Sequence, residues 1–279
     1  MQLTHGDVLS ILPDRAVDGH KGNYGKILLL CGSRGYTGAA ALAAMGALRC
    51  GAGLVFLGVP ESIYEIEAVK LTEPIVFPLP EEDGKYAIDA VALIQKKMRD
   101  MDAVLIGPGM GQSAGTMAVL NAVLQGFDGP VVVDADGINL LATDPSMLHQ
   151  RKGVTILTPH EGEFRRLVIG PQDDRVGGAV SMATALGCIV VRKGHETIIT
   201  DGKTVYINPT GNPGMAVGGS GDVLAGMLAG LLGQGIEPLQ AAACAVWLHG
   251  AAGDRCAEKL GQYAMLPSDM LAELPYLLK

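Results

Sequence analysis

Short runs of consecutive apolar residues recur along the chain and alternate with segments of helical periodicity. Each run is four to six residues long, which suits strands and is too short for most helices. Unbroken hydrophobicity indicates burial on both faces, as in a parallel sheet covered by helices. The alternation predicts an α/β fold with a mostly parallel central sheet and helices on both faces. The expected strands span residues 26–31, 54–59, 103–107, 130–134, 154–157 and 188–191, with an extended piece at 74–80.

The remaining elements follow from periodicity and from turn residues. Residues 197–200 and 204–207 flank an Asp-Gly pair, which predicts a β-hairpin. Residues 1–25 are expected to be irregular. Because there is no internal repeat or low-complexity linker, we expect one domain covering residues 1–279. Helices are predicted at residues 39–51, 61–70, 88–99, 114–125, 178–186, 223–232, 238–258 and 270–278.

Composition limits the classes of partner. The net charge of -8 and the pI near 5.2 argue against nucleic acid or an anionic membrane as the main partner, so a small-molecule ligand is expected. The chain has 39 glycines and only 4% aromatic residues, which predicts a core of small side chains that lets helices approach the sheet closely.

Cysteine usage and the N-terminal sequence predict a cytoplasmic protein. The five cysteines include no C-x-x-C pair, so neither a disulfide framework nor a zinc site is expected. The first residues lack a basic start followed by a long apolar stretch, which argues against a secretory signal. Residues 38–60 are the longest apolar stretch, but Arg49 and several glycines interrupt it, so we expect a helix and a strand there rather than a membrane span.

A glycine cluster late in the chain predicts an anion-binding site. Residues 208–214 carry two prolines and two glycines, residues 218–222 read GGSGD, and an apolar helical run follows. Glycines allow positive φ angles and close approach of a ligand. The unpaired amides of the helix's first turn then point toward that ligand, so a phosphate group fits there.

Asp222 is the unexpected residue in this arrangement. Two unit charges ~6 Å apart at an effective dielectric of 20 repel by roughly 3 kcal/mol, whereas a helix N-terminus returns at most about 2 kcal/mol. An acid is therefore a poor choice for phosphate binding alone, but it suits a base that takes a proton from a hydroxyl attacking the phosphate. The same imbalance predicts a divalent cation. The alternative is that Asp222 is only a first-turn helix acid.

Polar residues also follow several predicted strands, at the sheet edge where open parallel sheets bind ligands. Asp134 and Asp136 follow one strand, the sequence TPHEGE (158–163) follows the next, and RKGHET (192–197) follows a third. The alternatives are structural: Lys193 could be a solvated strand end, His160 could cap the next helix, and both aspartates could hold a loop. His249 lies among small residues of a long predicted helix and is expected to be packed in the core.

Three other enzyme classes are less consistent with the sequence. There is no G-x-x-x-x-G-K-[ST] motif, so the chain is not a P-loop protein, and the loop at residues 107–113 lacks the third glycine of the dinucleotide fingerprint. The sequence GQSAG (111–115) matches G-x-S-x-G, with Asp134 or Asp222 and His249 following in hydrolase order. However, Ser113 lies several residues past the predicted strand-to-helix turn, so a serine hydrolase using Ser113 is only a remote alternative.

Seven ordered motifs carry a family resemblance over nearly the whole chain. The Gly-Asp at a late helix start is similar to the anion hole and base of the ribokinase-like superfamily. Within that superfamily the chain resembles the NAD(P)H-hydrate dehydratases. The motifs are HKGNYGK, GPGMGQS, DADGINLLA, LTPHEGEF, KGHET, NPTGN and GGSGDVLAGMLAGLL.

The resemblance implies a role for individual residues. Asp222 matches the catalytic base that contacts the hydrate hydroxyl, and Ala39, Gly109 and His160 match positions that contact the hydrated dinucleotide. Where related kinases have asparagine in T-P-N-x-x-E, this chain has His160, while Glu163 keeps the acid position and is the candidate for magnesium. The implied nucleotide-binding residues are Lys193, Gly194, His195, Glu196 and Thr197, together with Gly219, Ser220 and Gly221.

The resemblance also implies an activity. It implies a ribokinase-like hydro-lyase that uses ADP, or ATP, with Mg²⁺ to repair hydrated NADH and NADPH by phosphorylating the ring hydroxyl and eliminating phosphate. It further implies a homotetramer, and the chain length leaves no room for the epimerase domain of some relatives, so a separate NAD(P)H-hydrate epimerase is expected. The alternatives are a ribokinase-type kinase of a small hydroxylated metabolite and a non-catalytic nucleotide sensor.

Overall fold

The structure is a computed structural model, which describes residues 1–167 and 174–279. A nine-stranded sheet in the order β11-β10-β9-β8-β7-β6-β1-β2-β3 runs through the centre of the molecule. The strands from β9 to β3 in this order are all parallel, and β10 and β11 are antiparallel to their neighbours. The strands are β1 (Lys26–Leu30), β2 (Leu54–Pro60), β3 (Ile75–Leu79), β6 (Ala103–Ile106), β7 (Val131–Val133), β8 (Thr155–Leu157), β9 (Ile189–Arg192), β10 (Ile198–Thr200) and β11 (Val205–Ile207).

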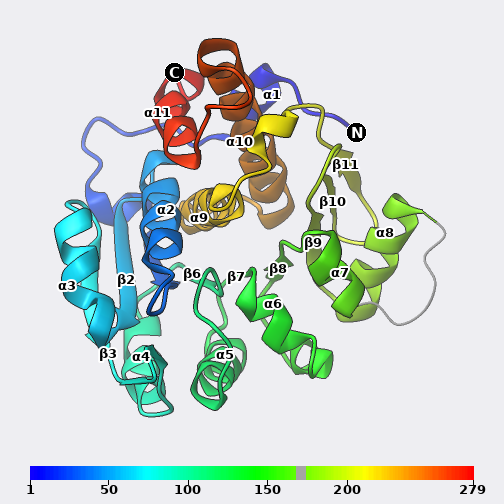
Figure 1. The fold of residues 1–279 in the computed structure, drawn as a ribbon. Coiled ribbons are helices and arrows are strands. Elements are labelled where there is room, and N and C mark those ends of the chain that lie inside the picture. The colour runs from blue at the N-terminus through cyan, green and yellow to red at the C-terminus, as the bar shows by residue number, and fades with distance from the viewer. Residues whose placement is uncertain (168–173) are drawn as a thin grey trace.

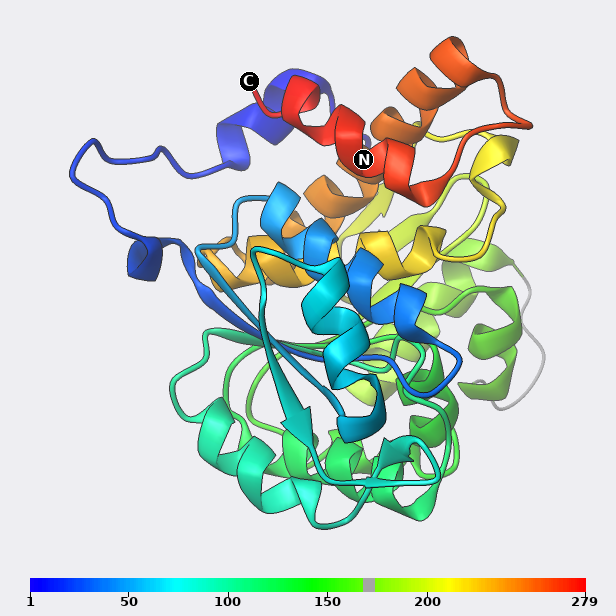
Figure 2. The same ribbon diagram turned by 60° about the vertical axis from the view of Figure 1, so that its left-hand side comes forward.

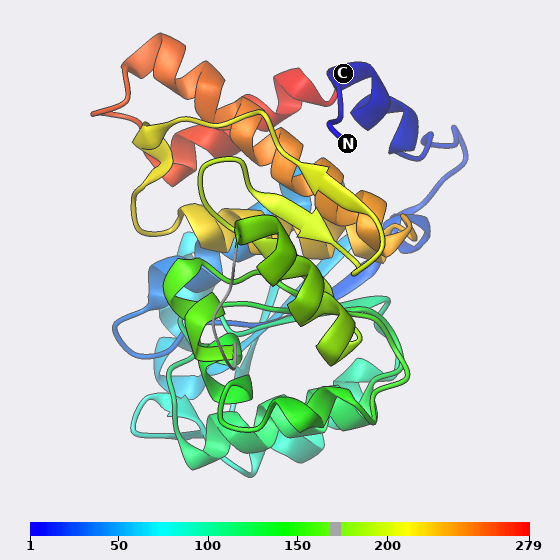
Figure 3. The same cartoon turned by 90° about the vertical axis from the view of Figure 1, so that its right-hand side faces the viewer.

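Helices cover both faces of the sheet, as the alternation of elements predicts (Figure 1). On one side lie α2 (Thr37–Arg49), α3 (Glu61–Lys70), α9 (Ser220–Gly233) and α10 (Pro238–Leu260), with α1 (His5–Ile11) and α11 (Pro267–Leu277) packed outside them against other helices. The other contains α4 (Ala90–Met98), α5 (Ala114–Gly126), α6 (Asp136–Leu141), α7 (Glu161–Leu167) and α8 (Arg175–Leu186). The β10–β11 hairpin, predicted from its Asp-Gly turn, lies against α10 (Figure 3).

The central strands are apolar throughout because the side chains on their two faces pack into two separate cores. In β1, Ile27 and Leu29 pack into the core beneath α2 and α9. Leu28 and Leu30 point to the opposite face and pack into the core beneath α4 and α5. Side chains alternate between the faces of a strand, so a strand covered on both sides carries no polar alternation.

Glycines on one face of α9 allow α2 and α9 to pack closely over the sheet. A Cβ added at Gly226 would lie 2.0 Å from the carbonyl oxygen of Ala43, and one at Gly230 would lie 2.6 Å from that of Ala47. A Cβ at Gly46 of α2 would meet the carbonyl oxygen of Val223 at 2.6 Å. The small-residue composition thus brings two helices together, and it is this packing that places the start of α9 beside the start of α2.

The first 25 residues are more ordered than the sequence suggested. Residues of α1 form a helix because the Thr4 side chain accepts a hydrogen bond from the backbone of Asp7, whose carboxylate in turn accepts one from the backbone of Thr4. His5 stacks on the Trp247 ring with centroids 5.3 Å apart, and its Nε2 lies 2.8 Å from the carbonyl oxygen of Leu277. These contacts hold α1 against α10 and α11, where both termini lie (Figure 2).

A small hairpin, β4 (Glu81–Glu82) and β5 (Lys85–Tyr86), was not predicted. Its turn places Asp83 at a φ of 51° and Gly84 at 75°. The buried hydroxyl of Tyr86 lies 2.9 Å from the carbonyl oxygen of Cys31 and 2.8 Å from that of Gly58. Tyr86 therefore ties the hairpin to the ends of β1 and β2.

In the part of the chain that the structure describes, no helix combines the length and the hydropathy that a membrane span requires. Residues 38–60, the longest apolar stretch, form most of α2 followed by β2, as expected.

Candidate active site

The strand order reverses between β1 and β6, because the chain runs outward from β1 to β2 in one direction and from β6 to β7 in the other. Such a reversal leaves a crevice at the carboxyl ends of the strands, where α/β proteins bind ligands. Here the loops after β1 and β6 meet. The amide of Gly32 donates to the carbonyl oxygen of Pro108 (2.8 Å), and the Ser33 hydroxyl donates to that of Gly109 (2.7 Å).

Ala39 and Gly109 are neighbours in this crevice. A Cβ added at Gly109 would lie 2.8 Å from the Ala39 Cβ, and Gly109 has a φ of 62°, which favours glycine. One turn further along α2, Leu42 contacts the start of α9, since a Cβ at Gly219 would meet the Leu42 Cδ1 at 2.5 Å. Ala39 and Gly109 therefore lie close to the glycine cluster at residues 218–222.

The glycine cluster forms the turn that starts α9. Gly219 adopts a left-handed conformation with a φ of 98°, and Ser220 is the first helical residue. The amides of the first turn have no partner within the helix, and those of Gly221 and Asp222 are among them. Asp222 is half-buried in this turn. The predicted anion site is thus built on the end of a helix.

Asp222 lies in a crowded acidic environment. The pKa of its carboxyl is raised to about 6, first by burial and next by the charge of Asp134, while the ammonium of Lys193 acts in the opposite direction. The carboxylates of Asp136 and Glu163 add smaller upward effects. A carboxyl that titrates near neutral pH is matched to proton transfer at that pH. A first-turn helix acid with only a structural role does not require these neighbours.

Lys193 follows β9, and its ammonium lies beside Asp134 and the first turn of α9. Its Nζ lies 2.7 Å from the Asp134 Oδ1, and a Cβ added at Gly221 would be 3.3 Å from that Nζ. Burial lowers the pKa of Lys193, but the carboxylates of Asp134 and Glu163 outweigh this effect and the net pKa is raised. The lysine is therefore a fixed positive charge beside the start of α9 rather than a solvated strand end.

The rest of the 193–197 segment is a loop that α8 holds in place and whose residues 194–196 are exposed. Gly194 and Glu196 have φ angles of 141° and 53°, and the Thr197 hydroxyl donates to the carbonyl oxygen of Gly194 (2.9 Å). The side chains of His195 and Glu196 are exposed. The Arg175 guanidinium of α8 donates to the carbonyl oxygens of His195 and Lys193 and thereby holds the loop.

His160 caps a helix and still has an exposed side chain. Its Nδ1 accepts from the amide of Gly162 (2.9 Å), so the ring does cap the start of α7, yet the side chain remains 57% exposed. The backbone of His160 donates to Glu163 Oε2 (2.8 Å), and its Nε2 lies 3.3 Å from Oε1. The carboxylate of Glu163, 4% exposed, is thus already occupied by His160.

The structure separates the residues of the remote hydrolase alternative. Ser113 is the N-cap of α5, and within the described residues its hydroxyl bonds only with Thr116. His249 is buried in α10, where its Nε2 lies 3.4 Å from the Ser220 hydroxyl. Burial lowers the pKa of His249 to about 4, so this ring is neutral at physiological pH. The prediction of a packed core histidine is confirmed, and no Ser113–His249 pair exists to support a hydrolase.

Arg192 and Thr158 support the site through buried contacts that the sequence pattern does not predict. Arg192, 4% exposed, forms a bidentate ion pair with Glu161 and lies 3.8 Å over the Phe164 ring. It joins the end of β9 to the start of α7. Its only signal in the sequence was its place at a strand end. The buried Thr158 hydroxyl donates to Asp134, a contact that the Thr158-Pro159 sequence does not predict.

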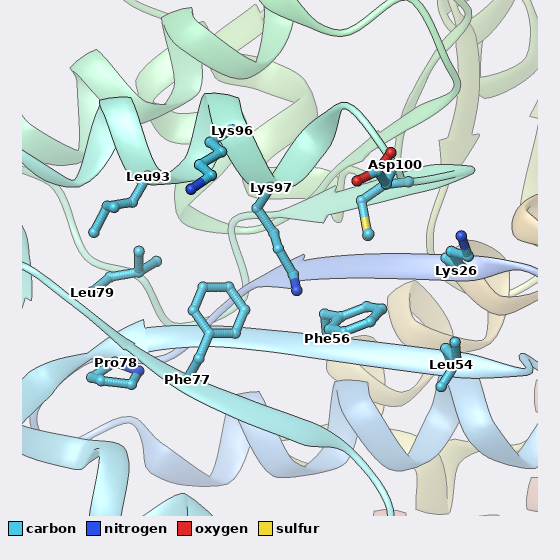
Figure 4. Close-up of a pocket in the computed structure, with 11 residues that line it drawn as sticks. Lys26, Leu54, Phe56, Phe77, Pro78, Leu79, Leu93, Lys96, Lys97 and Asp100 are labelled. Carbon is cyan, nitrogen blue, oxygen red and sulfur yellow. The ribbon is translucent and has the colours of Figure 1, made fainter.

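A separate cavity lies at the other edge of the sheet, between β2, β3 and α4 (Figure 4). Its volume is about 620 Å³. The Lys97 ammonium projects into it, 3.7 Å from the centroid of the Phe56 ring and 5.4 Å from that of Phe77. No residue that lines it is among those assigned to the crevice.

Comparison with known proteins identifies the chain's relatives. Residues 27–276 match the family model described as NAD(P)H-hydrate dehydratase. A bifunctional NAD(P)H-hydrate repair enzyme of Moorella thermoacetica is 46% identical over 277 residues, covering 97% of this chain and 52% of that protein. The ADP-dependent (S)-NAD(P)H-hydrate dehydratase of Neisseria meningitidis serogroup B is 36% identical over 266 residues, covering 92% and 86%.

A solved structure supports the same grouping. The ADP/ATP-dependent NAD(P)H-hydrate dehydratase of Bacillus subtilis, co-crystallised with ATP/Mg²⁺, superposes with a TM-score of 0.83 at 34% identity and covers 98% of this chain and 96% of that one. The expected ribokinase-like α/β fold is thereby confirmed. The chain spans about half the length of the bifunctional relatives.

Proposed function

The chain belongs to the NAD(P)H-hydrate dehydratase family, and from this membership we propose that it is an ADP-dependent (S)-NAD(P)H-hydrate dehydratase, a hydro-lyase that repairs hydrated NADH and NADPH. The observation that carries the proposal is Asp222, a half-buried acid with a pKa of about 6, in the first turn of α9 beside the ammonium of Lys193. A base and an anion site are adjacent there, as a phosphoryl transfer to a hydroxyl requires.

In the proposed reaction Asp222 takes the proton from the ring hydroxyl of the hydrate. The hydroxyl oxygen then forms a bond to the terminal phosphorus of ADP, and AMP leaves; with ATP, ADP leaves. The lone pair of the ring nitrogen next expels the new phosphate group by breaking its carbon–oxygen bond. Loss of a proton from the neighbouring ring carbon restores the dihydronicotinamide. Phosphorylation is needed because hydroxide is a poor leaving group.

The other residues of the site have supporting roles in this proposal. The amides of Gly219 and Gly221 bind the phosphates of the nucleotide, Ser220 joins them in the turn with its own amide donating to the carbonyl oxygen of Val217, and Lys193 adds a positive charge. The backbone of the loop from Gly194 to Thr197 lines the nucleotide site. On the other side, the small residues Ala39 and Gly109 leave room for the hydrated ring, and the exposed ring of His160 contacts the dinucleotide.

Magnesium fits this site as part of a metal–nucleotide complex. Mg²⁺ favours oxygen ligands and usually binds through one or two carboxylates plus substrate phosphates. Within residues 1–167 and 174–279 no three acidic, histidine or cysteine groups are placed to hold a metal by themselves, which agrees with an ion that arrives with the nucleotide. Because His160 occupies the Glu163 carboxylate, we propose that Glu163 acts on the ion through water. When bound, the ion neutralises phosphate charge.

The proposal also covers the cellular setting. Five free, buried cysteines support a reducing, cytoplasmic environment. The bifunctional relatives support cooperation with an NAD(P)H-hydrate epimerase. We further propose a homotetramer, which the mass of the protein in solution will test.

A direct assay tests the activity. Purified protein is incubated with hydrated NADPH, Mg²⁺ and either ADP or ATP, and the absorbance of the reduced nicotinamide is followed together with release of orthophosphate. We expect both signals to rise in parallel, with ADP as the better nucleotide. A ribokinase-type kinase would instead produce a stable phosphorylated product without recovery of absorbance, and a nucleotide sensor would bind nucleotide without any turnover.

A further inference from the structure

Asp134 is a buried carboxylate with two side-chain partners. It follows β7 and is 1% exposed. Its Oδ1 accepts hydrogen bonds from the Lys193 Nζ (2.7 Å) and from the Thr158 hydroxyl (2.7 Å). A buried carboxylate costs several kcal/mol unless a counter-charge and hydrogen bonds offset the loss of water. The position of the Lys193 ammonium is therefore strongly determined by Asp134.

The fixed ammonium lies where the proposed reaction develops charge. The Lys193 side chain is 18% exposed, so it is accessible from the crevice, and its Nζ lies beside Gly221 in the first turn of α9. The amide of Lys193 also donates to the carbonyl oxygen of Pro159 (2.8 Å), which anchors the backbone. Both ends of this side chain are therefore held.

We propose that Asp134 is a positioning residue, which with Thr158 holds the Lys193 ammonium beside the start of α9 so that it stabilises the phosphoryl group in transfer. The proposal rests on the proposed function. A lysine side chain is flexible and loses conformational freedom when it binds. A counter-charge that fixes it beforehand removes that cost from the reaction, and preorganised charge is the main source of transition-state stabilisation.

Asp134 also acts on the base. Asp222 is faced by Asp134 and Asp136 after β7, by Glu163 of α7, by Lys193 after β9 and by Cys31 after β1. Among these charges Asp134 has the largest effect on the pKa of Asp222, and that effect is upward. Removing the charge of Asp134 therefore lowers the pKa of Asp222 even if Lys193 moves away. Thr158 carries no charge, so its removal leaves this titration in place and separates the charge of Asp134 from its hydrogen bond to Thr158.

The test compares three variants with the wild type. Asp134→Asn removes the charge, Thr158→Val removes only the second hydrogen bond, and Thr158→Ser keeps the hydroxyl. For Asp134→Asn we expect kcat to fall by about 10- to 100-fold, the KM for ADP to stay level or fall, and the acidic limb of the kcat profile to move to lower pH. Thr158→Val should lower kcat less and leave the pH profile in place. Thr158→Ser should restore most of the activity.

A double-mutant cycle with Lys193→Met then shows whether the two residues act as a unit. If they do, Asp134→Asn has little effect on kcat in the Lys193→Met background. Wild-type kcat in Asp134→Asn, or a changed KM with an unmoved pH profile, would overturn the proposal. If Asp134→Asn does not fold, an unchanged kcat in Thr158→Val serves as the refutation.

Failure of the proposed function would look different. In that case the wild-type protein does not convert the hydrate with either ADP or ATP. The double-mutant cycle of Asp134→Asn and Lys193→Met is then measured as the affinity for ADP instead of kcat. Lys193→Met must then weaken ADP binding more in the wild-type background than in the Asp134→Asn background. Equal losses in the two backgrounds would refute the positioning role independently of the activity.

Discussion

Asp222 meets two conflicting demands at a single residue. As a base it must be ionised, yet burial and the charge of Asp134 oppose ionisation and raise its pKa to about 6. The result is a carboxylate that is ionised at neutral pH but has a higher proton affinity than a solvated aspartate. That property is useful for proton abstraction and unfavourable for folding.

The kinetic prediction follows from the first demand. Asp222→Asn keeps the size of the side chain but cannot accept the proton, so we expect kcat to fall by about 10² to 10⁴ while ADP still binds. In the wild type, kcat should rise with pH through about 6, because protonation of Asp222 removes the base. Steady-state kinetics from pH 5 to 8 and calorimetric titration with ADP measure both effects. Full activity in Asp222→Asn would exclude the assigned role.

The stability prediction follows from the second demand. The pKa of Asp222 is higher in the folded protein than the ~3.9 of an unfolded chain, so its contribution to stability is present below pH ~3.9 and is lost as the pH rises through about 6. Asp222→Asn should therefore raise the free energy of unfolding by about 1–2 kcal/mol at pH 8, after allowance for partial solvent exposure. Urea denaturation at pH 8 and pH 4 measures this, and the gain should vanish at the lower pH.

Among single residues, those with distinctive chemistry could be predicted from the sequence. Residues whose role depends on a contact with a distant part of the chain could not. Asp222 stood out because an acid beside a glycine cluster is electrostatically unexpected. Lys193 and Asp134 lie 59 positions apart, so their ion pair depends on the strand order, which the sequence does not specify. Ala39 contributes only small size, and nothing but the family resemblance could have identified it.

Among the elements, the packing of α2 on α9 determines where the site forms. Gly226 approaches the backbone of Ala43 so closely that no side chain fits between them. The start of α9 therefore has a fixed position over the crevice. Glycine in the middle of a helix costs roughly 0.5–1 kcal/mol relative to alanine, a cost that this close packing offsets.

Substitution of this glycine should be strongly destabilising. A Cβ at position 226 meets a backbone oxygen at 2.0 Å, so Gly226→Ala must push the helices apart, and we expect a loss of at least about 2 kcal/mol in the free energy of unfolding. Gly38→Ala is the matched control, because a Cβ in this first turn of α2 meets nothing within 4 Å and should be neutral or slightly stabilising. Chemical denaturation compares the two; equal stabilities would show that the helix contact can relax.

Several charged side chains lie close together near the carboxyl ends of the parallel strands. The carboxylates of Asp134, Asp136, Glu163 and Asp222 all act on one another or on the single ammonium of Lys193. Burial raises the pKa of Glu163 and of Asp222, as expected where carboxylates lie close together away from water. A nucleotide that enters this environment meets net repulsion unless a cation accompanies it.

Removal of magnesium should therefore weaken nucleotide binding. We expect the affinity for ADP to fall at least about 10-fold, or about 1.4 kcal/mol, when Mg²⁺ is chelated. Calorimetric titration with and without Mg²⁺ measures the change, with sodium chloride added to match the ionic strength. An ADP affinity that is independent of the divalent cation would show that the helix amides and Lys193 bind the nucleotide without a metal.

Most elements could be predicted, and those missed depend on particular local interactions. The β4–β5 hairpin relies on Asp83 adopting a positive φ and on Tyr86 reaching two distant carbonyls, neither of which has a sequence pattern. The helix α6 begins after Ala135, which also has a positive φ of 48°, an unusual conformation for alanine. The α1 helix is short, with only Val8 buried, so its periodicity was too weak to recognise.

For the whole molecule, continuous apolar strands specified an α/β sheet covered on both faces but not the order of the strands. The position of β1 between β2 and β6 creates the crevice. Alternate residues of β1 belong to different cores. The two helical layers are therefore coupled through the same backbone hydrogen bonds.

This shared sheet predicts that the chain unfolds as one unit, as expected for a single domain. Trp247, the only tryptophan, lies in α10 and reports on one helical layer, while far-UV circular dichroism reports on both. Because loss of either layer exposes one face of every central strand, we expect the two probes to give the same midpoint in urea. Trp247 also stacks on His5, so His5→Ala serves to separate local loss of α1 from global unfolding. Different midpoints in both proteins would show that the layers unfold independently and that the single-domain prediction is wrong.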